Sequence, residues 1–398
     1  MYFILKKNIY FLILIITSSC YSYSKDNIEK KRISIDSVKI KTGADNYMKY
    51  LPLLKNKKVG IVTNQTGILT NKIHLVDFLL EEKIAIQTIF APEHGFRGTA
   101  DAGEHIVDGK DAKTGLSIIS LYGDNKKPQA TQLAGIDIML FDLQDVGARF
   151  YTYISSLHYI MEACAENGIP LLILDRPNPN GSIIDGPLLE KEFTSFVGMH
   201  PIPLLHGMTI GEYAQMINGE KWLKNSVQCK LTVIPCIDYN RKMEYNLPLK
   251  PSPNLPNDQS INLYASLCLF EGTNVSVGRG TEKQFQIYGS PFLTESTFTF
   301  TPKPNFGAKD PLYNGKECFG EDLTTYPKLT RLELKWLIKA YQNTRAKTKF
   351  FNPFFTKLAG TKKLKQQIES GISENKIRKS WKNGLTTFKK MRMKYVIY

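Results

Sequence analysis

The residues with the clearest chemical potential are Glu93, His94 and Arg97, which follow a short apolar segment at residues 84–90. A solvated turn with a satisfied histidine is the simplest interpretation of this stretch. Three other apolar segments, however, also end in polar clusters. Asn64 and Gln65 follow residues 59–62, Asp142, Gln144, Asp145 and Arg149 follow residues 136–141, and Asp175, Arg176 and Asn178 follow residues 171–174. The recurrence favours a binding site over four unrelated turns.

A second polar concentration lies at residues 267–282 and contains Glu271, Asn274, Arg279 and Glu282 among several glycines. Amides and carboxylates suit a ligand with many hydroxyl groups, and arginines suit a carboxylate or phosphate, which they can hold with two parallel hydrogen bonds. Two carboxylates across a cleft are the usual equipment for hydrolysis of a glycosidic bond. A sugar with an acidic substituent is therefore the ligand class that these residues favour.

The elements that position these clusters alternate strands with helices between residues 34 and 187, which predicts an α/β fold with a parallel sheet. The expected strands are 59–62, 84–90, 117–121, 136–141 and 171–174, and the expected helices are 71–82 and 153–167, with Gly168 as the C-cap. Ligands of such sheets bind outside the carboxyl ends of the strands. Beyond residue 187 we expect a helix at 211–217 with a capping box, a strand at 231–235, a helix at 364–377 and a terminal strand at 393–398.

The amino-acid composition excludes few classes of protein. With 398 residues, 42% hydrophobic and 22% charged, the chain is an ordinary globular protein with room for two or three domains. Its net charge of +15 favours an anionic partner such as nucleic acid, anionic lipid or an acidic polymer. The basic residues form no dense run interleaved with aromatics, which argues against nucleic acid.

The N-terminus has the layout of a signal peptide over residues 1–20: two lysines, an apolar run at 9–16 and small residues up to Cys20. The Ser19-Cys20 pair resembles a lipoprotein processing site, so we expect lipidation of Cys20. An ordinary signal peptide with an incidental cysteine is the alternative. Residues 21–33 are expected to be a polar tether, and the membrane is expected to be a partner only through the lipid anchor.

The sequence lacks the motifs of several enzyme classes. The sequence has no GxGxxG after a strand, no Walker-type loop and no GxSxG, which argues against a dinucleotide, a nucleoside triphosphate and a serine hydrolase. His94, Asp101, Glu104 and His105 could hold a metal ion, but their spacing does not fit HExxH. We therefore expect neither a metal nor an organic cofactor.

Seven motifs together resemble the NamZ-type exo-β-N-acetylmuramidases. They are GIVTNQTG (60–67), FAPEHGFRG (90–98), FDLQDVGARFYTY (141–153), LDRPNPNG (174–181), DGPLLE (185–190), PSPNLP (251–256) and FEGTNVSVGRGTEKQF (270–285). The resemblance runs from about residue 36 to the C-terminus, and one departure is Ser182, where the family often has a second glycine. It implies a Rossmann-like domain (34–187), a smaller α/β domain (188–398) and a cleft between them.

The resemblance also implies release of terminal N-acetylmuramic acid from the non-reducing ends of peptidoglycan fragments. The signal-peptide layout predicts that the protein is exported and is periplasmic or anchored in the outer membrane. Glu93 is our predicted general acid/base, the alternative being a loop carboxylate paired with Arg97. Glu271 is the predicted second carboxylate, the alternative being an ion pair with Arg279 at a domain interface.

The other predicted site residues would bind the sugar. Arg149, Arg176 and Arg279 are expected to bind the lactyl carboxylate, Asn64, Asp142, Gln144, Asn178 and Asn274 the hydroxyl and acetamido groups, and Gln65, His94, Arg97, Asp175 and Glu282 complete the site. Two competing functions are a non-catalytic lipoprotein that binds muramyl sugars and a metal-dependent amidohydrolase that acts on muramyl peptides.

Overall fold

The computed structural model describes residues 40–97, 108–294 and 296–398. The predicted signal peptide, the tether and Cys20 lie outside the described residues, and so do Asp101, Glu104 and His105. No helix within the described part is long and apolar enough to span a bilayer.

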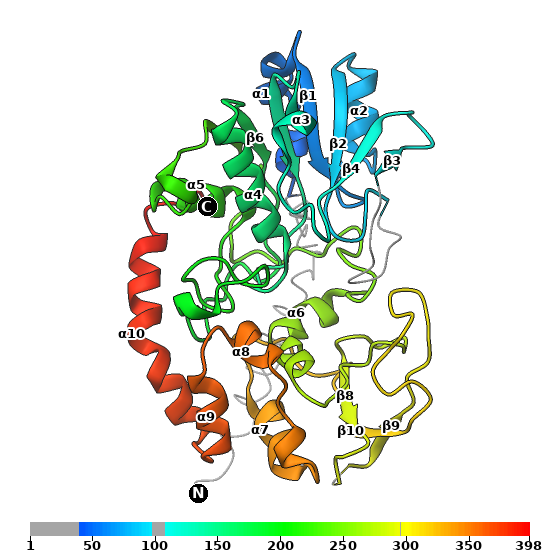
Figure 1. The fold of residues 1–398 in the computed structure, drawn as a ribbon, viewed down its shortest axis with the longest axis vertical. Coiled ribbons are helices and arrows are strands. Elements are labelled where there is room, and N and C mark those ends of the chain that lie inside the picture. The colour runs from blue at the N-terminus through cyan, green and yellow to red at the C-terminus, as the bar shows by residue number, and fades with distance from the viewer. Residues whose placement is uncertain (1–39, 98–107, 295) are drawn as a thin grey trace, which may run out of the picture. The chain divides into compact units, whose positions relative to one another are not determined.

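A seven-stranded sheet in the order β3-β4-β2-β1-β5-β6-β7 organises the first part of the chain (Figure 1). Its strands are β1 (Lys58–Thr63), β2 (Ala85–Ala91), β3 (Gly109–Lys110), β4 (Ser117–Ser120), β5 (Ile138–Asp142), β6 (Leu171–Leu174) and β7 (Leu231–Ile234). All neighbours are parallel except β3 and β4. The six parallel strands follow the doubly wound order. In this order the ligand-binding crevice lies where the strand order reverses, that is, where successive strands begin to be added on the opposite side of the first strand. That point is between β1 and β5.

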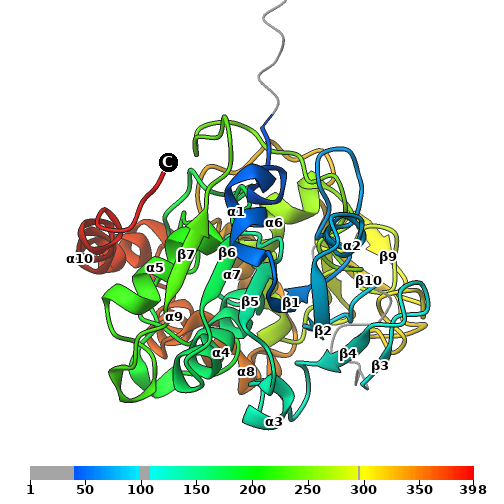
Figure 2. The same ribbon diagram turned by 90° about the horizontal axis from the view of Figure 1, so that it is seen from above.

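Helices cover both faces of this sheet, which explains why β5 and β6 are buried along their whole length (Figure 2). They are α1 (Tyr47–Leu54) and α2 (Leu75–Glu81) on one face and α4 (Tyr153–Glu166) and α5 (Ile210–Gly219) on the other, with a short α3 (Ala130–Leu133). Val62 pairs with Phe90 and with Phe141, and Thr63 pairs with Asp142. This register brings the carboxyl ends of β2, β1 and β5 side by side.

The predicted α/β class and the five strands expected before residue 187 are confirmed. Helix α2 begins at residue 75 rather than 71, because His74 accepts a hydrogen bond from the Val76 amide and caps the helix. Helix α5 has the expected capping box between Thr209 and Glu212. The large sheet also takes β7 from beyond residue 187, where we placed a domain boundary, so its strands are not confined to 34–187.

A second, three-stranded antiparallel sheet in the order β8-β10-β9 lies in the later half of the chain. Its strands are β8 (Ile287–Ser290), β9 (Phe298–Phe300) and β10 (Cys318–Asp322), and the helices around it are α6 (Asp258–Leu267), α7 (Lys335–Asn343), α8 (Phe354–Ala359) and α9 (Lys363–Glu369). One hydrophobic cluster includes Leu157 of α4, Trp336 of α7 and Phe388 further on. The two sheets therefore share a continuous core.

The C-terminal prediction is wrong in two respects. The expected helix at 364–377 is split, because α9 ends at Glu369 and Gly371 follows with φ of 68°, a conformation that favours glycine. A new helix, α10 (Glu374–Arg392), then runs from α9 to the vicinity of α5 (Figure 1). The expected strand at 393–398 is absent from the described residues, and this segment is an irregular tail.

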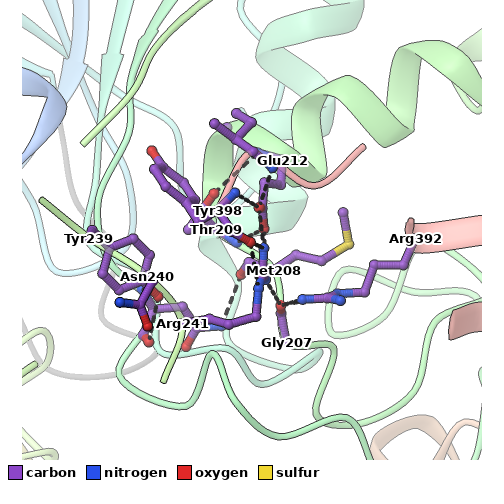
Figure 3. A network of polar contacts seen from close by, with 12 residues as sticks. Gly207, Met208, Thr209, Glu212, Tyr239, Asn240, Arg241, Arg392 and Tyr398 are labelled. Atoms are coloured by element: carbon purple, nitrogen blue, oxygen red, sulfur yellow. Dashed lines mark hydrogen bonds and ion pairs between the residues drawn. The ribbon is translucent and has the colours of Figure 1, made fainter. Parts of the chain in front are cut away.

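The tail is held by a buried polar network at the start of α5 (Figure 3). The Glu212 carboxylate, which is fully buried, accepts hydrogen bonds from Arg241 Nη2 (2.7 Å) and from the Ile397 amide (2.7 Å). Arg241 Nε also donates to the Tyr398 carbonyl (2.9 Å), and the Tyr398 hydroxyl donates to Asp175 at the end of β6 (2.9 Å). The tail thus stabilises the same loop edge as the strand-end residues.

We expect Glu212→Gln to lower the free energy of unfolding by about 3 kcal/mol, because Arg241 loses the partner of a buried ion pair. Urea unfolding at pH 7 measures this loss. Glu244→Gln is the control, since Glu244 forms an exposed ion pair with Lys328 and should leave the unfolding midpoint unchanged. Equal midpoints for the two variants would contradict the structural role of the network.

Candidate functional site

A buried ion pair joins the ends of β5 and β6. Arg176 donates from Nε to Asp142 Oδ1 (2.5 Å) and from Nη2 to Asp142 Oδ2 (2.9 Å), and Nη2 also donates to the Ile68 carbonyl (3.0 Å). Both side chains are almost completely buried. Burial alone would lower the pKa of Arg176, but the Asp142 carboxylate raises it. The pair is a brace between three strand-end loops, and it engages both carboxylate oxygens of Asp142 and the Nε and Nη2 donors of Arg176.

Asp175 also forms its hydrogen bonds with other residues in the interior of the protein. It accepts hydrogen bonds from the Thr209 hydroxyl (2.7 Å) and the Gly211 amide (2.8 Å), and so anchors the first turn of α5. Burial raises the pKa of Asp175 to about 6. This placement favours a structural role for Asp175 over direct contact with a ligand.

The predicted amides at the strand ends shape their loops. Asn64 accepts from the Thr66 amide (2.9 Å) and donates to the Tyr153 hydroxyl (2.7 Å). Asn178 donates to the Met208 carbonyl (2.9 Å) and accepts from the Asn180 amide. Gln144 donates to the Pro177 carbonyl (2.8 Å), but its side-chain oxygen is buried without a partner among the described residues. Of these three, Gln144 keeps an open acceptor.

Arg149 is fully buried and binds carbonyl groups rather than a carboxylate. Its Nη1 donates to Pro187 and Ile202 (2.9 and 2.7 Å), and its Nη2 donates to Leu358 and Ala359 (3.0 and 2.8 Å). Burial lowers the pKa of Arg149 to about 9. The guanidinium ties two distant segments together, and this geometry favours a structural role over the predicted grip on a lactyl carboxylate.

The loop after β2 carries Glu93 at a half-buried position. Thr152 at the start of α4 donates to Glu93 Oε2 (3.0 Å). His94 is buried and has φ of 74°, an uncommon conformation for a residue with a side chain that is often found at functional sites. Arg97 binds Asp111 through Nη2 (2.8 Å to both oxygens).

The second cluster centres on Glu271, which follows α6 in a short 3₁₀ helix (Cys268–Gly272). Arg279 donates to Glu271 Oε1 from Nε and lies within 2.7 Å of it through Nη2, and its guanidinium lies over the Phe285 ring. Both side chains are about one-quarter exposed. The ion pair that we weighed as an alternative therefore exists, and it leaves both groups accessible. Glu282 is exposed on the following turn.

One aromatic cluster connects Glu93 with Glu271. Tyr151 packs on Tyr153 (4.8 Å between ring centres) and on Tyr264 (6.0 Å), and Tyr264 packs on Phe285 (4.9 Å) beneath Arg279. Burial raises the pKa of Tyr153 and Tyr264, and the charges of Glu93 and Glu271 respectively add to this increase. The two predicted carboxylates therefore flank the same cluster.

Two loops connect the strand ends with the Glu271 region. At the first, Gln65 donates to the Lys250 carbonyl (3.4 Å), and Tyr151 donates to the Pro251 carbonyl (2.8 Å). This first loop continues to Asn254, which donates to the Gly307 carbonyl (2.6 Å) of the second loop.

The second loop contacts the segment after Glu271, where Tyr313 donates to the Asn274 carbonyl (2.7 Å) and Asn305 donates to the Thr281 carbonyl (3.1 Å). Residues up to 185 positions apart thus meet along one seam.

Amide groups along this seam share an unusual property: they have buried atoms without a hydrogen-bond partner among the described residues. On the seam they are the side-chain oxygens of Gln65, Asn254 and Asn305 and both the oxygen and the nitrogen of Asn274, and Gln144 has such an oxygen at the neighbouring end of β5. Other atoms of this kind, such as Ser195 Oγ and Gln367 Oε1, are scattered over the rest of the described chain. An unsatisfied buried polar group costs about 1–3 kcal/mol, and native structures contain few of them. Their concentration at one seam supports a binding site for a polar ligand.

Two residues of this site were missed from the sequence: Thr152 and Asn305. Asn254 lies in a motif that we singled out, and its amide is of the kind that suits a ligand with many hydroxyl groups. Thr152 and Asn305 reach the site only through the packing of α4 and of the second loop. Among the described residues, no group of three or more His, Cys, Asp and Glu side chains is placed to hold a metal ion.

Comparisons with known proteins cover nearly the whole described chain. Two family models match it: exo-beta-N-acetylmuramidase NamZ, N-terminal, over residues 59–259, and its C-terminal counterpart over residues 262–398. The peptidoglycan beta-N-acetylmuramidase NamZ of Bacillus subtilis (strain 168) is 40% identical over 393 residues, covering 93% of this chain and 94% of the relative.

Two solved structures, both DUF1343 family proteins from Bacteroides fragilis NCTC 9343, share the fold. The first has a TM-score of 0.84 and 45% identity, and the second has 0.74 and 26%. Each alignment covers 90% of this chain and 99% of the other.

Proposed function

The chain belongs to the NamZ family of exo-β-N-acetylmuramidases, and from this membership we propose that it is a glycoside hydrolase of peptidoglycan fragments. It releases terminal β-linked N-acetylmuramic acid from the non-reducing end. The observation that carries the proposal is the match of both family models in sequence order across residues 59–259 and 262–398. The direct test is turnover by the purified protein of a chromogenic N-acetylmuramic acid glycoside, with the N-acetylglucosamine analogue as the comparison.

We propose that Glu93 is the general acid/base of this reaction. Its half-buried position after β2 and the hydrogen bond from Thr152 support this role, because a proton donor needs a fixed orientation toward the leaving oxygen. Glu271 is the proposed second carboxylate. Its ion pair with Arg279 keeps a negative charge beside the aromatic cluster, where it would stabilise the positive charge that develops on the sugar ring.

Arg279 is the proposed partner of the lactyl carboxylate. Of the three arginines predicted for this task, Arg149 and Arg176 are buried and engaged within the fold, whereas Arg279 is one-quarter exposed. Asn274 lies five residues earlier, and the nitrogen and oxygen of its buried amide have no hydrogen-bond partner among the described residues. A secondary amide such as the acetamido group of the sugar needs that combination.

The cellular location of the protein is proposed from its N-terminus. Residues 1–20 support export, and Ser19-Cys20 supports a lipid anchor at Cys20 on a periplasmic or outer-membrane-attached protein. Incorporation of a labelled fatty acid into the wild type but not into Cys20→Ser is the expected result. Label in both proteins, or in neither, would exclude the anchor at this residue.

Replacing Glu93 by Gln should lower kcat at least about 100-fold, because general acid–base catalysis contributes factors of this size. Glu271→Gln should have a comparable effect, and both variants should keep their folded circular dichroism spectrum. Glu317→Gln, an exposed carboxylate outside the site, is the matched control and should retain full activity. A folded Glu93→Gln variant with more than one-tenth of the wild-type kcat would refute the assignment.

Arg279→Lys should weaken inhibition by free N-acetylmuramic acid about tenfold, because a lysine cannot reproduce two parallel hydrogen bonds to a carboxylate. Inhibition by N-acetylglucosamine, which lacks the lactyl group, should change little. Asn274→Ala is the informative counterpart, since it should weaken both sugars by the same factor. If Arg279→Lys also weakens both sugars equally, Arg279 does not recognise the lactyl carboxylate.

A further inference from the structure

A basic groove lies along α10, away from the residues discussed above. It has a volume of about 570 Å³, with α10 on one side and Asp185 on the other. Ile377, Trp381 and Phe388 form the buried face of α10. The adjoining face carries Lys379, Lys382 and Lys389, which line the groove and are exposed.

The positive charge of the three lysines in this groove is not neutralised by any carboxylate among the described residues. Arg378 is paired, since its Nη2 donates to Asp185 Oδ2 (2.6 Å). Lys379, Lys382 and Lys389 have no carboxylate partner in the described part of the chain. Lys379 and Lys382 are three residues apart on α10, a spacing at which like charges repel each other. An anionic ligand would relieve this repulsion.

The length of the groove and its lining residues indicate which kind of ligand it can bind. Lys379 and Lys389 are ten residues apart on one helix, which corresponds to about 15 Å along its axis. An extended peptide of about four or five residues spans the same length. The lining offers a single apolar side chain, Leu385, and no aromatic ring on which a nucleic-acid base could stack.

We propose that the α10 groove binds a short peptide rich in carboxylates. If the substrate is peptidoglycan, the acidic peptides carried by its muramyl residues are such ligands, and the groove would hold the polymer while its terminal sugar is removed. Only this identification of the polymer rests on the proposed function. The affinity of the groove for an acidic peptide follows from its charge and its length.

Binding of fluorophore-labelled tetraglutamate to the full folded protein, followed by fluorescence anisotropy at low salt, tests the proposal. The variant Lys379→Gln/Lys382→Gln/Lys389→Gln should bind at least tenfold more weakly than the wild type. The control variant Lys357→Gln/Lys376→Gln/Lys390→Gln removes the same charge from exposed positions outside the groove and should bind like the wild type. A labelled tetraglutamine peptide should not bind.

Three outcomes would overturn the proposal: equal losses in the two triple variants, equal binding of tetraglutamine, or binding only of tripolyphosphate or phosphatidylglycerol vesicles. The groove variant should also hydrolyse a small chromogenic muramic acid glycoside at the wild-type rate, because its lysines lie outside the catalytic residues. If the wild type does not hydrolyse this glycoside but binds tetraglutamate through the groove, the proposed function fails while the groove assignment stands.

Discussion

The buried ion pair between Asp142 and Arg176 is the interaction on which the arrangement of the strand-end loops depends. The pair lies where the chain reverses its winding, and Arg176 also binds the Ile68 carbonyl, so loops from β1, β5 and β6 meet at one guanidinium. Removal of either partner would leave an uncompensated charge in the interior, which typically costs 3–5 kcal/mol. Charged residues thus build the frame that supports the proposed site.

A second constraint is the continuous core beneath the two sheets. A cleft between two independently packed domains would leave the relation of its carboxylates free to vary. Here one hydrophobic cluster runs from α4 through α7 to α10, and the tyrosines between Glu93 and Glu271 belong to it. Arg149 adds a polar tie, because its acceptors include carbonyls 209 and 210 residues away in the sequence. The positions of the two glutamates are therefore coupled through packing, which suits a reaction that needs both at a fixed separation.

The sequence predicted the fold well where hydrophobic periodicity and the capping or turn residues mark where strands and helices begin and end. Buried parallel strands are short apolar runs, and the segments at 59–62, 136–141 and 171–174 are visible as such. The roles of the site residues were harder to predict, because a charged side chain at a strand end has the same appearance whether it faces a ligand or a buried partner. Arg149 illustrates this limit, since no local pattern shows that carbonyls will surround it. Helix α10 was missed for a related reason: its lysine-rich exposed face masks the spacing of Ile377, Trp381 and Phe388.

The positive charges of the molecule fall into three environments, and this difference bears on the chemistry. Arg149 and Arg176 are buried and engaged within the fold, and the groove lysines of α10 are exposed and have no carboxylate partner among the described residues. Arg279 is intermediate: it is partly exposed and already bound to Glu271. If it turns toward the carboxylate of an incoming sugar, Glu271 loses part of its counter-charge at the moment when the sugar ring begins to gain positive charge. Recognition of the lactyl group would then strengthen the electrostatic stabilisation of the transition state, so that binding of the correct sugar and acceleration of its cleavage share one ion pair.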